Sequence, residues 1–176
     1  MRIIAGEKRG HYLIGPPQVD IKGLRPMPDK VREAIFNILG SWVLGKEILD
    51  LYAGTGAVGL EALSRGAKDV TFVELSKKTV DVIEKNRDKL GFSAEVFQRD
   101  AKSFIVAVQK KYDLIFITPP HAQIDFEVAK NAGSKLKKGG IIIQESESKE
   151  DIPGIEGLKK IDHRIYGKLK LTFFEK

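Results

Sequence analysis

A turn spaced by glycines follows a short apolar run near residue 50, where the chain reads DLYAGTGAVG from Asp50 to Gly59. Gly54, Gly56 and Gly59 allow the backbone to turn sharply, to approach a ligand closely and to pack a helix against its strand. The spacing predicts a nucleotide-binding turn between a strand and a helix. Loops of this composition also serve as tight connections without a ligand, so the residues around the turn are needed to distinguish a binding site from a structural turn.

Asp50 stands at the end of the apolar run, where a dinucleotide-binding fold would keep an apolar residue. A carboxylate at this place would repel a pyrophosphate but suits a cation. S-adenosylmethionine carries ammonium and sulfonium groups and no phosphate. We therefore favour this cofactor over a dinucleotide and over a purely structural turn.

Two further acidic residues end predicted strands. Glu74 ends the run 70–74, about 20 residues after the glycine turn, where a ribose-binding carboxylate is expected; a solvated strand end is the alternative. Asp100 follows the run 94–98 and could accept a hydrogen bond from an adenine amino group. Ligands of open sheets bind outside the carboxyl ends of the strands, so three acids at successive strand ends favour one binding site.

The fourth predicted strand, 113–117, leads into Thr118-Pro119-Pro120-His121. Two prolines remove two backbone donors and fix the direction of the chain, which leaves carbonyl groups rigidly presented to a ligand. An isolated proline pair is more often a simple strand terminator. Because this one follows a glycine turn and acidic strand ends, we interpret it as a catalytic loop.

Strand and helix patterns alternate around these residues. Expected strands cover 47–51, 70–74, 94–98, 113–117 and 140–146, and expected helices cover 57–65, 77–90, 101–110 and 124–137. This order predicts a doubly wound α/β sheet, mostly parallel, with helices on both faces. The runs 159–165 and 168–174, joined by Tyr166-Gly167, predict a C-terminal antiparallel hairpin. The combination is the Rossmann-like architecture expected of class I methyltransferases.

Residues 1–45 are expected to form a basic extension. They hold seven basic and four acidic residues, in a chain whose net charge is +6. Short strands at 2–5 and 11–14 flank a basic turn, a proline-rich linker covers 15–28, and a helix runs from Pro28, its first residue, to Leu39. The excess of positive charge favours RNA or DNA as a partner, with ordinary solubilising charge as the alternative.

Length and composition predict one compact unit, in which the extension 1–45 joins a cofactor-binding domain at 46–176. The chain has no cysteine, and its three histidines are scattered, so we expect no metal site. Neither a membrane-spanning apolar stretch nor a signal peptide is visible. We expect a cytoplasmic monomer.

These residues resemble the RsmD-like 16S rRNA guanine-N2 methyltransferases over nearly the whole chain. The cofactor segments LDLYAGTG at 49–56 and GLEALSRGA at 59–67 alone indicate only a class I methyltransferase. The specific matches are RIIAG at 2–6, RG at 9–10, LRP at 24–26 and VREAIFNIL at 31–39, with YG at 166–167.

The resemblance implies S-adenosylmethionine as cofactor and ribosomal RNA, or the small ribosomal subunit, as partner. Asp50 would line the methionine end of the cofactor, Glu74 would hold the ribose hydroxyls, and Asp100 would contact adenine. The expected cofactor-binding set is Asp50, Ala53, Gly54, Gly56, Glu74, Leu75, Asp100 and Ala101. The expected phosphate contacts are Arg2, Lys8, Arg9, Arg25 and Arg32, although Arg32 could instead pair with an acid of the adjoining domain.

The predicted catalytic residues Thr118, Pro119, Pro120 and His121 depart from the family, which carries Asp-Pro-Pro-Tyr or a close relative here. Thr118 is a neutral and weaker acceptor than a carboxylate, while His121 can still stack on a base. Losing a charge-assisted hydrogen bond would slow the reaction by roughly tenfold to more than a hundredfold. A noncatalytic RNA-binding relative and a methyltransferase with another substrate therefore remain alternatives.

Overall fold

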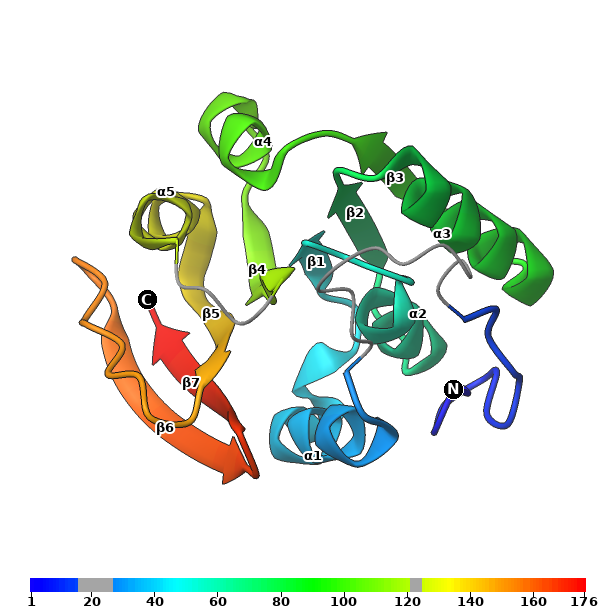
Figure 1. Ribbon diagram of the computed structural model, residues 1–176, viewed down its shortest axis with the longest axis horizontal. Coiled ribbons are helices and arrows are strands. Elements are labelled where there is room, and N and C mark those ends of the chain that lie inside the picture. Colours follow the sequence, from blue (N-terminus) through cyan, green and yellow to red (C-terminus); the bar gives the residue numbers. More distant parts are fainter. Residues whose placement is uncertain (16–26, 121–124) are drawn as a thin grey trace.

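The computed structural model describes residues 1–15, 27–120 and 125–176. It contains a seven-stranded sheet in the order β3-β2-β1-β4-β5-β7-β6. The strands from β3 to β5 pair in parallel, and β7 runs antiparallel to both of its neighbours. This arrangement confirms the predicted mostly parallel sheet with a C-terminal antiparallel hairpin (Figure 1).

The strands are β1 (Glu47–Leu51), β2 (Asp69–Glu74), β3 (Glu95–Gln98), β4 (Tyr112–Ile117), β5 (Leu136–Glu147), β6 (Lys159–Tyr166) and β7 (Leu169–Glu175). The helices are α1 (Asp29–Leu39), α2 (Ala57–Ser64), α3 (Lys77–Leu90), α4 (Ala101–Ala107) and α5 (Phe126–Ser134), and a 3-10 turn, η1, covers Gly40–Val43.

Helices cover both faces of the sheet, with α1, α2 and α3 on one side and α4 and α5 on the other (Figure 1). The central strands β1 and β4 are almost continuously apolar because side chains on both faces are buried. One hydrophobic cluster joins α1, α2 and the sheet and includes Ile3 and Leu13 from the N-terminus. The other lies beneath α4 and α5. The N-terminal segment thus shares a core with the sheet.

Some element boundaries differ from the predicted ones. The helix expected over 101–110 ends at Ala107, because Val108 adopts an extended conformation. The helix expected over 124–137 ends at Ser134, and β5 already begins at Leu136, since the amide of Tyr112 donates to the carbonyl of Lys135 (2.8 Å). Pro28 caps α1 rather than forming its first residue. Position 124 lies outside the described residues.

The first fifteen residues fold back on themselves, but the short strands expected at 2–5 and 11–14 do not form. Arg2 and Tyr12 form an antiparallel bridge, and the amide of Ile3 donates to the carbonyl of His11 (2.9 Å). We call residues 1–15 the N-terminal arm. Most of the linker expected over 15–28 falls among residues that the structure does not describe.

Candidate active site

The glycine turn connects β1 to α2 as the spacing predicts. Gly54 and Gly56 have positive φ angles of 55° and 75°, and Gly56 is the residue that caps α2. A Cβ atom on Gly59 would lie 2.3 Å from the buried ring of Phe72 on β2. The turn therefore needs glycine for its backbone conformation, and α2 needs it to approach the sheet.

Asp50 is buried beneath this turn, with only 1% of its surface exposed. Its Oδ2 accepts a hydrogen bond from the amide of Gly59 (3.1 Å), whereas its Oδ1 is buried and has no hydrogen-bond partner among the described residues. Burial raises the pKa of Asp50 from 3.8 to about 7; the Gly59 amide opposes this rise and the nearby Glu74 adds to it. A cation bound nearby would favour the ionised carboxylate.

Glu74, the last residue of β2, holds the other side of the turn. Its Oε2 accepts from the amide of Gly54 (3.0 Å) and its Oε1 from the amide of Ser76 (2.9 Å). The amide of Ala53 donates to the carbonyl of Val73 (3.0 Å), which ties the turn to β2 again. Each carboxylate oxygen can accept a second hydrogen bond, so Glu74 can still bind hydroxyl groups.

Asp100 lies beyond β3 and caps α4. Its Oδ1 accepts from both the amide and the hydroxyl of Ser103 (2.9 and 3.0 Å), which leaves Oδ2 as an acceptor for a ligand. The amide of Arg99 donates to the carbonyl of Glu74 (3.0 Å) and joins the ends of β3 and β2. Of the remaining predicted cofactor residues, Leu75 is largely exposed, whereas Ala53 and Ala101 are buried.

Tyr52 belongs to this site but is absent from the predicted set. It is the one residue other than glycine with a positive φ angle (62°) in the described part of the chain. Its pKa is raised to about 12, first by burial and then by the carboxylates of Asp125 and Asp100. Strained backbone of this kind clusters at binding sites, and an aromatic residue directly before Ala53-Gly54 was the available sequence signal.

The Thr118-Pro119-Pro120 segment lies beside the glycine turn, because β4 is the neighbour of β1 and Ile117 pairs with Leu51. The hydroxyl of Thr118 donates to the carbonyl of Leu51 (3.4 Å), so its oxygen lone pairs stay available. Pro119 is buried and Pro120 is exposed. His121 lies outside the described residues.

The five predicted phosphate contacts divide into four groups. Arg2 and Arg9 are exposed on the N-terminal arm. Lys8 is partly buried; its ammonium group pairs with Glu7 (2.7 Å) and lies 5.8 Å from the centre of the Phe92 ring. Arg25 falls in the undescribed segment 16–26.

The prediction for Arg32 is wrong, because this side chain is fully buried and cannot reach a phosphate. Its Nη2 donates to the carbonyl of Arg2 (2.6 Å) and to Oδ1 of Asp29 (3.0 Å), and its Nε lies 3.7 Å from the carboxylate of Glu61. The alternative pairing with acids is therefore what the structure shows.

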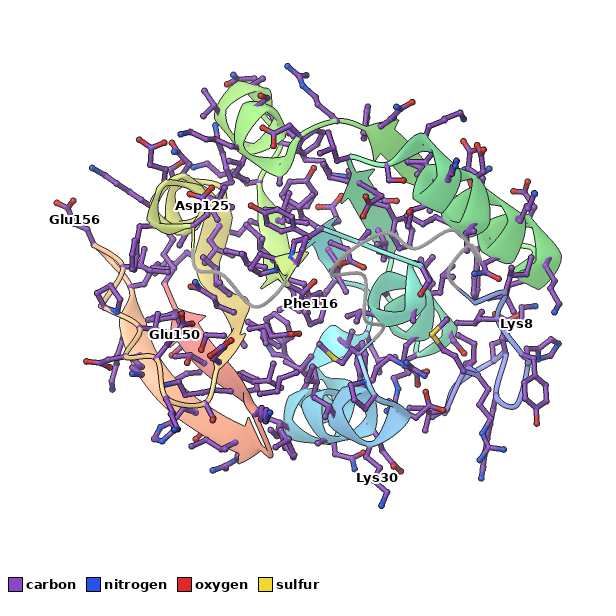
Figure 2. All side chains as sticks on the ribbon, viewed as in Figure 1. Lys8, Lys30, Phe116, Asp125, Glu150 and Glu156 are labelled. Atoms are coloured by element: carbon purple, nitrogen blue, oxygen red, sulfur yellow. The ribbon has the colours of Figure 1, made fainter. Side chains whose placement is uncertain are left out.

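Glu61 on α2 is the centre of this buried network. Its carboxylate accepts from the amides of Ile4 (2.7 Å) and Ala5 (3.0 Å) and from Nε of Arg65 (2.7 Å). In Figure 2, the labelled Lys8 marks the position of the N-terminal arm. Because Glu61 accepts from backbone amides of the arm, α2 determines where the arm lies.

Asn86 makes a second connection, between the arm and the glycine turn. Its side chain accepts from the amide of Ile14 (2.7 Å) and donates to the carbonyls of Ile14 (3.1 Å) and Thr55 (3.3 Å). The end of the arm thus lies next to the predicted cofactor turn.

Within the described ranges, no helix is long and apolar enough to cross a membrane, and no acid or histidine cluster could hold a metal ion.

Comparisons with known proteins show the family to which the chain belongs. The family described as conserved hypothetical protein 95 matches residues 1–175. Ribosomal RNA small subunit methyltransferase D of Haemophilus influenzae is 40% identical over 77% of the chain and 70% of its own length. Putative rRNA methyltransferase YlbH of Bacillus subtilis is 31% identical over 100% of the chain and 99% of its own. The solved structure of putative methyltransferase yhhF from Escherichia coli covers 100% of the chain and 97% of its own, with 30% identity and a TM-score of 0.89.

Proposed function

The chain belongs to the family described as conserved hypothetical protein 95, and on this basis we propose that it is an S-adenosylmethionine-dependent rRNA methyltransferase. Its proposed product is N2-methylguanine in small-subunit (16S) ribosomal RNA. The relative from Haemophilus influenzae carries a small-subunit rRNA methyltransferase name, which supports the substrate class. We propose that it acts in the cytoplasm, where its proposed rRNA substrate lies, and that it acts as a monomer.

The residues at the carboxyl ends of β1, β2 and β3 fit this cofactor. The unpartnered Oδ1 of Asp50, the carboxylate of Glu74 and Oδ2 of Asp100 are all acceptors. They suit a ligand that presents ammonium, hydroxyl and amino groups and no phosphate. This set of acceptors is the observation that supports the proposal best. When bound, S-adenosylmethionine supplies an electrophilic methyl group.

The Thr118-Pro119-Pro120 segment is proposed to orient the target amine. The oxygen of Thr118 and the proline carbonyls can accept hydrogen bonds from N–H groups, and Thr118 already contacts Leu51 at the end of β1. Methylation of an amine needs orientation more than a strong base. A rigid segment next to the cofactor turn meets this need.

The exposed Arg2 and Arg9 support RNA as the substrate, and we propose that they contact phosphates. Each lost phosphate contact should lower the slope of log affinity against log salt by about 1. Arg9→Gln should therefore bind small-subunit RNA more weakly and with a shallower salt dependence. Lys138→Gln is a matched control, because Lys138 is an exposed basic residue near the start of β5, outside the N-terminal arm. Equal salt slopes for the two variants would contradict the assignment of Arg9.

The test of the function is transfer of a tritiated methyl group from S-adenosylmethionine to undermethylated small ribosomal subunits. Large subunits, tRNA and bulk protein serve as controls. Label confined to small-subunit RNA and recovered as N2-methylguanine is the expected result. Failure to bind S-adenosylmethionine at any reasonable concentration would refute the proposal.

A noncatalytic RNA-binding protein is the second candidate, and the neutral Thr118 is the observation that favours it. This candidate predicts cofactor and RNA binding without methyl transfer. Thr118→Asp combined with His121→Tyr should then create activity in a protein that has none.

A further inference from the structure

Glu145 lies on the part of β5 that extends beyond the end of β4. β4 ends at Ile117, whose partner on β5 is Gln144, whereas β5 continues to Glu147 alongside β7. The residues that follow this last pair are Thr118 and Glu145. Neighbouring strands lie about 4.8 Å apart, so Glu145 borders the crevice that contains the Thr118-Pro119-Pro120 segment.

The register also gives the face of the sheet on which Glu145 lies. Phe116 pairs with Ile143, and both belong to the core beneath α1. Figure 2 shows Phe116 between β4 and α1. Side chains alternate along a strand, so Glu145 lies on the same face as Ile143. Its partner on β7, Leu171, belongs to that core as well.

Glu145 is partly buried, and its carboxylate makes no ion pair or hydrogen bond with any described residue. Burial alone raises its pKa to about 7. The carboxylates of Asp50 and Glu74 differ from that of Glu145, because they accept hydrogen bonds from backbone amides that they hold in place. A carboxylate that loses water without gaining a partner destabilises the fold, which points to a role outside folding.

We propose that Glu145 is a substrate-binding residue, whose carboxylate accepts hydrogen bonds from the exocyclic amine and the adjacent ring N–H of the target guanine. This inference rests on the proposed function. Guanine presents N1–H and N2–H donors side by side, and the two oxygens of a carboxylate can accept both. Glu145 thus supplies the charged acceptor that Thr118 lacks.

The proposal also explains selection of guanine over adenine. Adenine carries an unprotonated ring nitrogen next to its amine, and two acceptors would then face each other. Enzymes that act on a base read its hydrogen-bonding edge in this way after the base leaves the stack. Glu145 is therefore a specificity residue, separate from the acids that we assign to the cofactor.

A binding experiment tests the role of Glu145 without relying on methyl transfer. Protein saturated with S-adenosylhomocysteine is titrated with guanosine monophosphate and with inosine monophosphate, which lacks the N2 amine, and binding is followed by ligand-observed NMR. The wild type should bind the guanine nucleotide about tenfold or more tightly. Glu145→Gln should lose most of this preference. Equal affinity of the wild type for both nucleotides would overturn the inference, whatever the result of the methyl-transfer assay.

Two further variants separate this role from a structural one. Glu147→Gln is the matched control, because Glu147 is an exposed residue on the same strand and the same face. Glu147→Gln should keep the guanine preference. Glu145→Gln should keep the wild-type affinity for S-adenosylhomocysteine, and its thermal midpoint should be no lower than that of the wild type, because the substitution removes a carboxylate that destabilises the fold. Thr118→Asp should restore the preference to Glu145→Gln by returning a carboxylate to the neighbouring strand end. A Glu145→Gln protein that discriminates as well as the wild type would refute the proposal.

Discussion

Replacing Asp50 with Asn should make the free energy of unfolding of the protein less dependent on pH. Asp50 is 1% exposed, and its pKa is raised from an ordinary value of 3.8 to about 7. Asn keeps an oxygen that can accept from the Gly59 amide, which Oδ2 of Asp50 now does at 3.1 Å. The substitution therefore removes the ionisation while it conserves the contact that holds α2.

The sign of the effect follows from the raised pKa. Between about pH 4 and pH 7 the folded protein keeps a proton on Asp50 that the unfolded chain has lost, so the free energy of unfolding falls as the pH rises. Each pKa unit corresponds to about 1.4 kcal/mol, and a rise from 3.8 to about 7 therefore corresponds to about 4 kcal/mol. Above about pH 7 both states are ionised and the contribution stays constant.

Urea unfolding of both proteins without cofactor, from about pH 5 to pH 8, measures this contribution. The free energy of unfolding of Asp50→Asn minus that of the wild type should grow by about 2 kcal/mol from pH 5 to pH 7 and level off by about pH 8. Glu145, whose pKa is also about 7, affects both proteins equally and cancels in this difference. The exposed Asp151→Asn is the control. Profiles that stay parallel within about 1 kcal/mol would refute the assignment of the proton to Asp50.

Two other substitutions test the elements that hold the site. Glu61→Ala should destabilise the protein by about 3–5 kcal/mol in urea unfolding, because it removes one of the carboxylates that face the buried Arg32 and the acceptor of the Ile4 and Ala5 amides. Asp81→Ala, in the exposed pair with Lys77, should cost less than about 1 kcal/mol. A cost for Glu61→Ala as small as that of Asp81→Ala would contradict the network. Gly59→Ala should lower the free energy of unfolding by about 1–3 kcal/mol, because the added Cβ would meet the Phe72 ring. It should also weaken S-adenosylmethionine binding, measured by calorimetry. Gly154→Ala is the control and should change neither quantity, because its Cβ would meet nothing within 4 Å.

The parts of the structure that sequence reasoning predicted depend on local patterns. The α3 helix matches its predicted range of 77–90 because the Ser76 cap and Gly91 mark its ends. The glycine turn was predictable for a similar reason, since the positive φ angles of Gly54 and Gly56 exclude most other residues. The end of the helix predicted over 101–110 was not, because its last residues have no comparable stop signal.

The wrong or missing site assignments concern contacts between segments far apart in the chain. Arg32 is a basic residue in a basic stretch of sequence, as a phosphate contact would be. Only the folded chain brings Glu61, 29 positions away, close enough to make Arg32 a buried ion-pair residue. Glu145 becomes a candidate only through the register of β4 and β5. Tyr52 likewise has neighbours, Asp100 and Asp125, that only the folded sheet brings close. Strand order can be predicted from a pattern, but which residues meet across the strand ends cannot.

The α2 helix connects the two functions that we propose for this chain. Its first turn is held by Asp50 through the amide of Gly59, and two residues further on Glu61 holds the amides of Ile4 and Ala5. Asn86 adds a second connection, from Ile14 to the carbonyl of Thr55. The exposed Arg2 and Arg9 are thus carried on a short arm that is fixed to the cofactor turn. A phosphate bound there would have a defined position relative to the methyl donor, and this rigidity orients a large RNA at a small site.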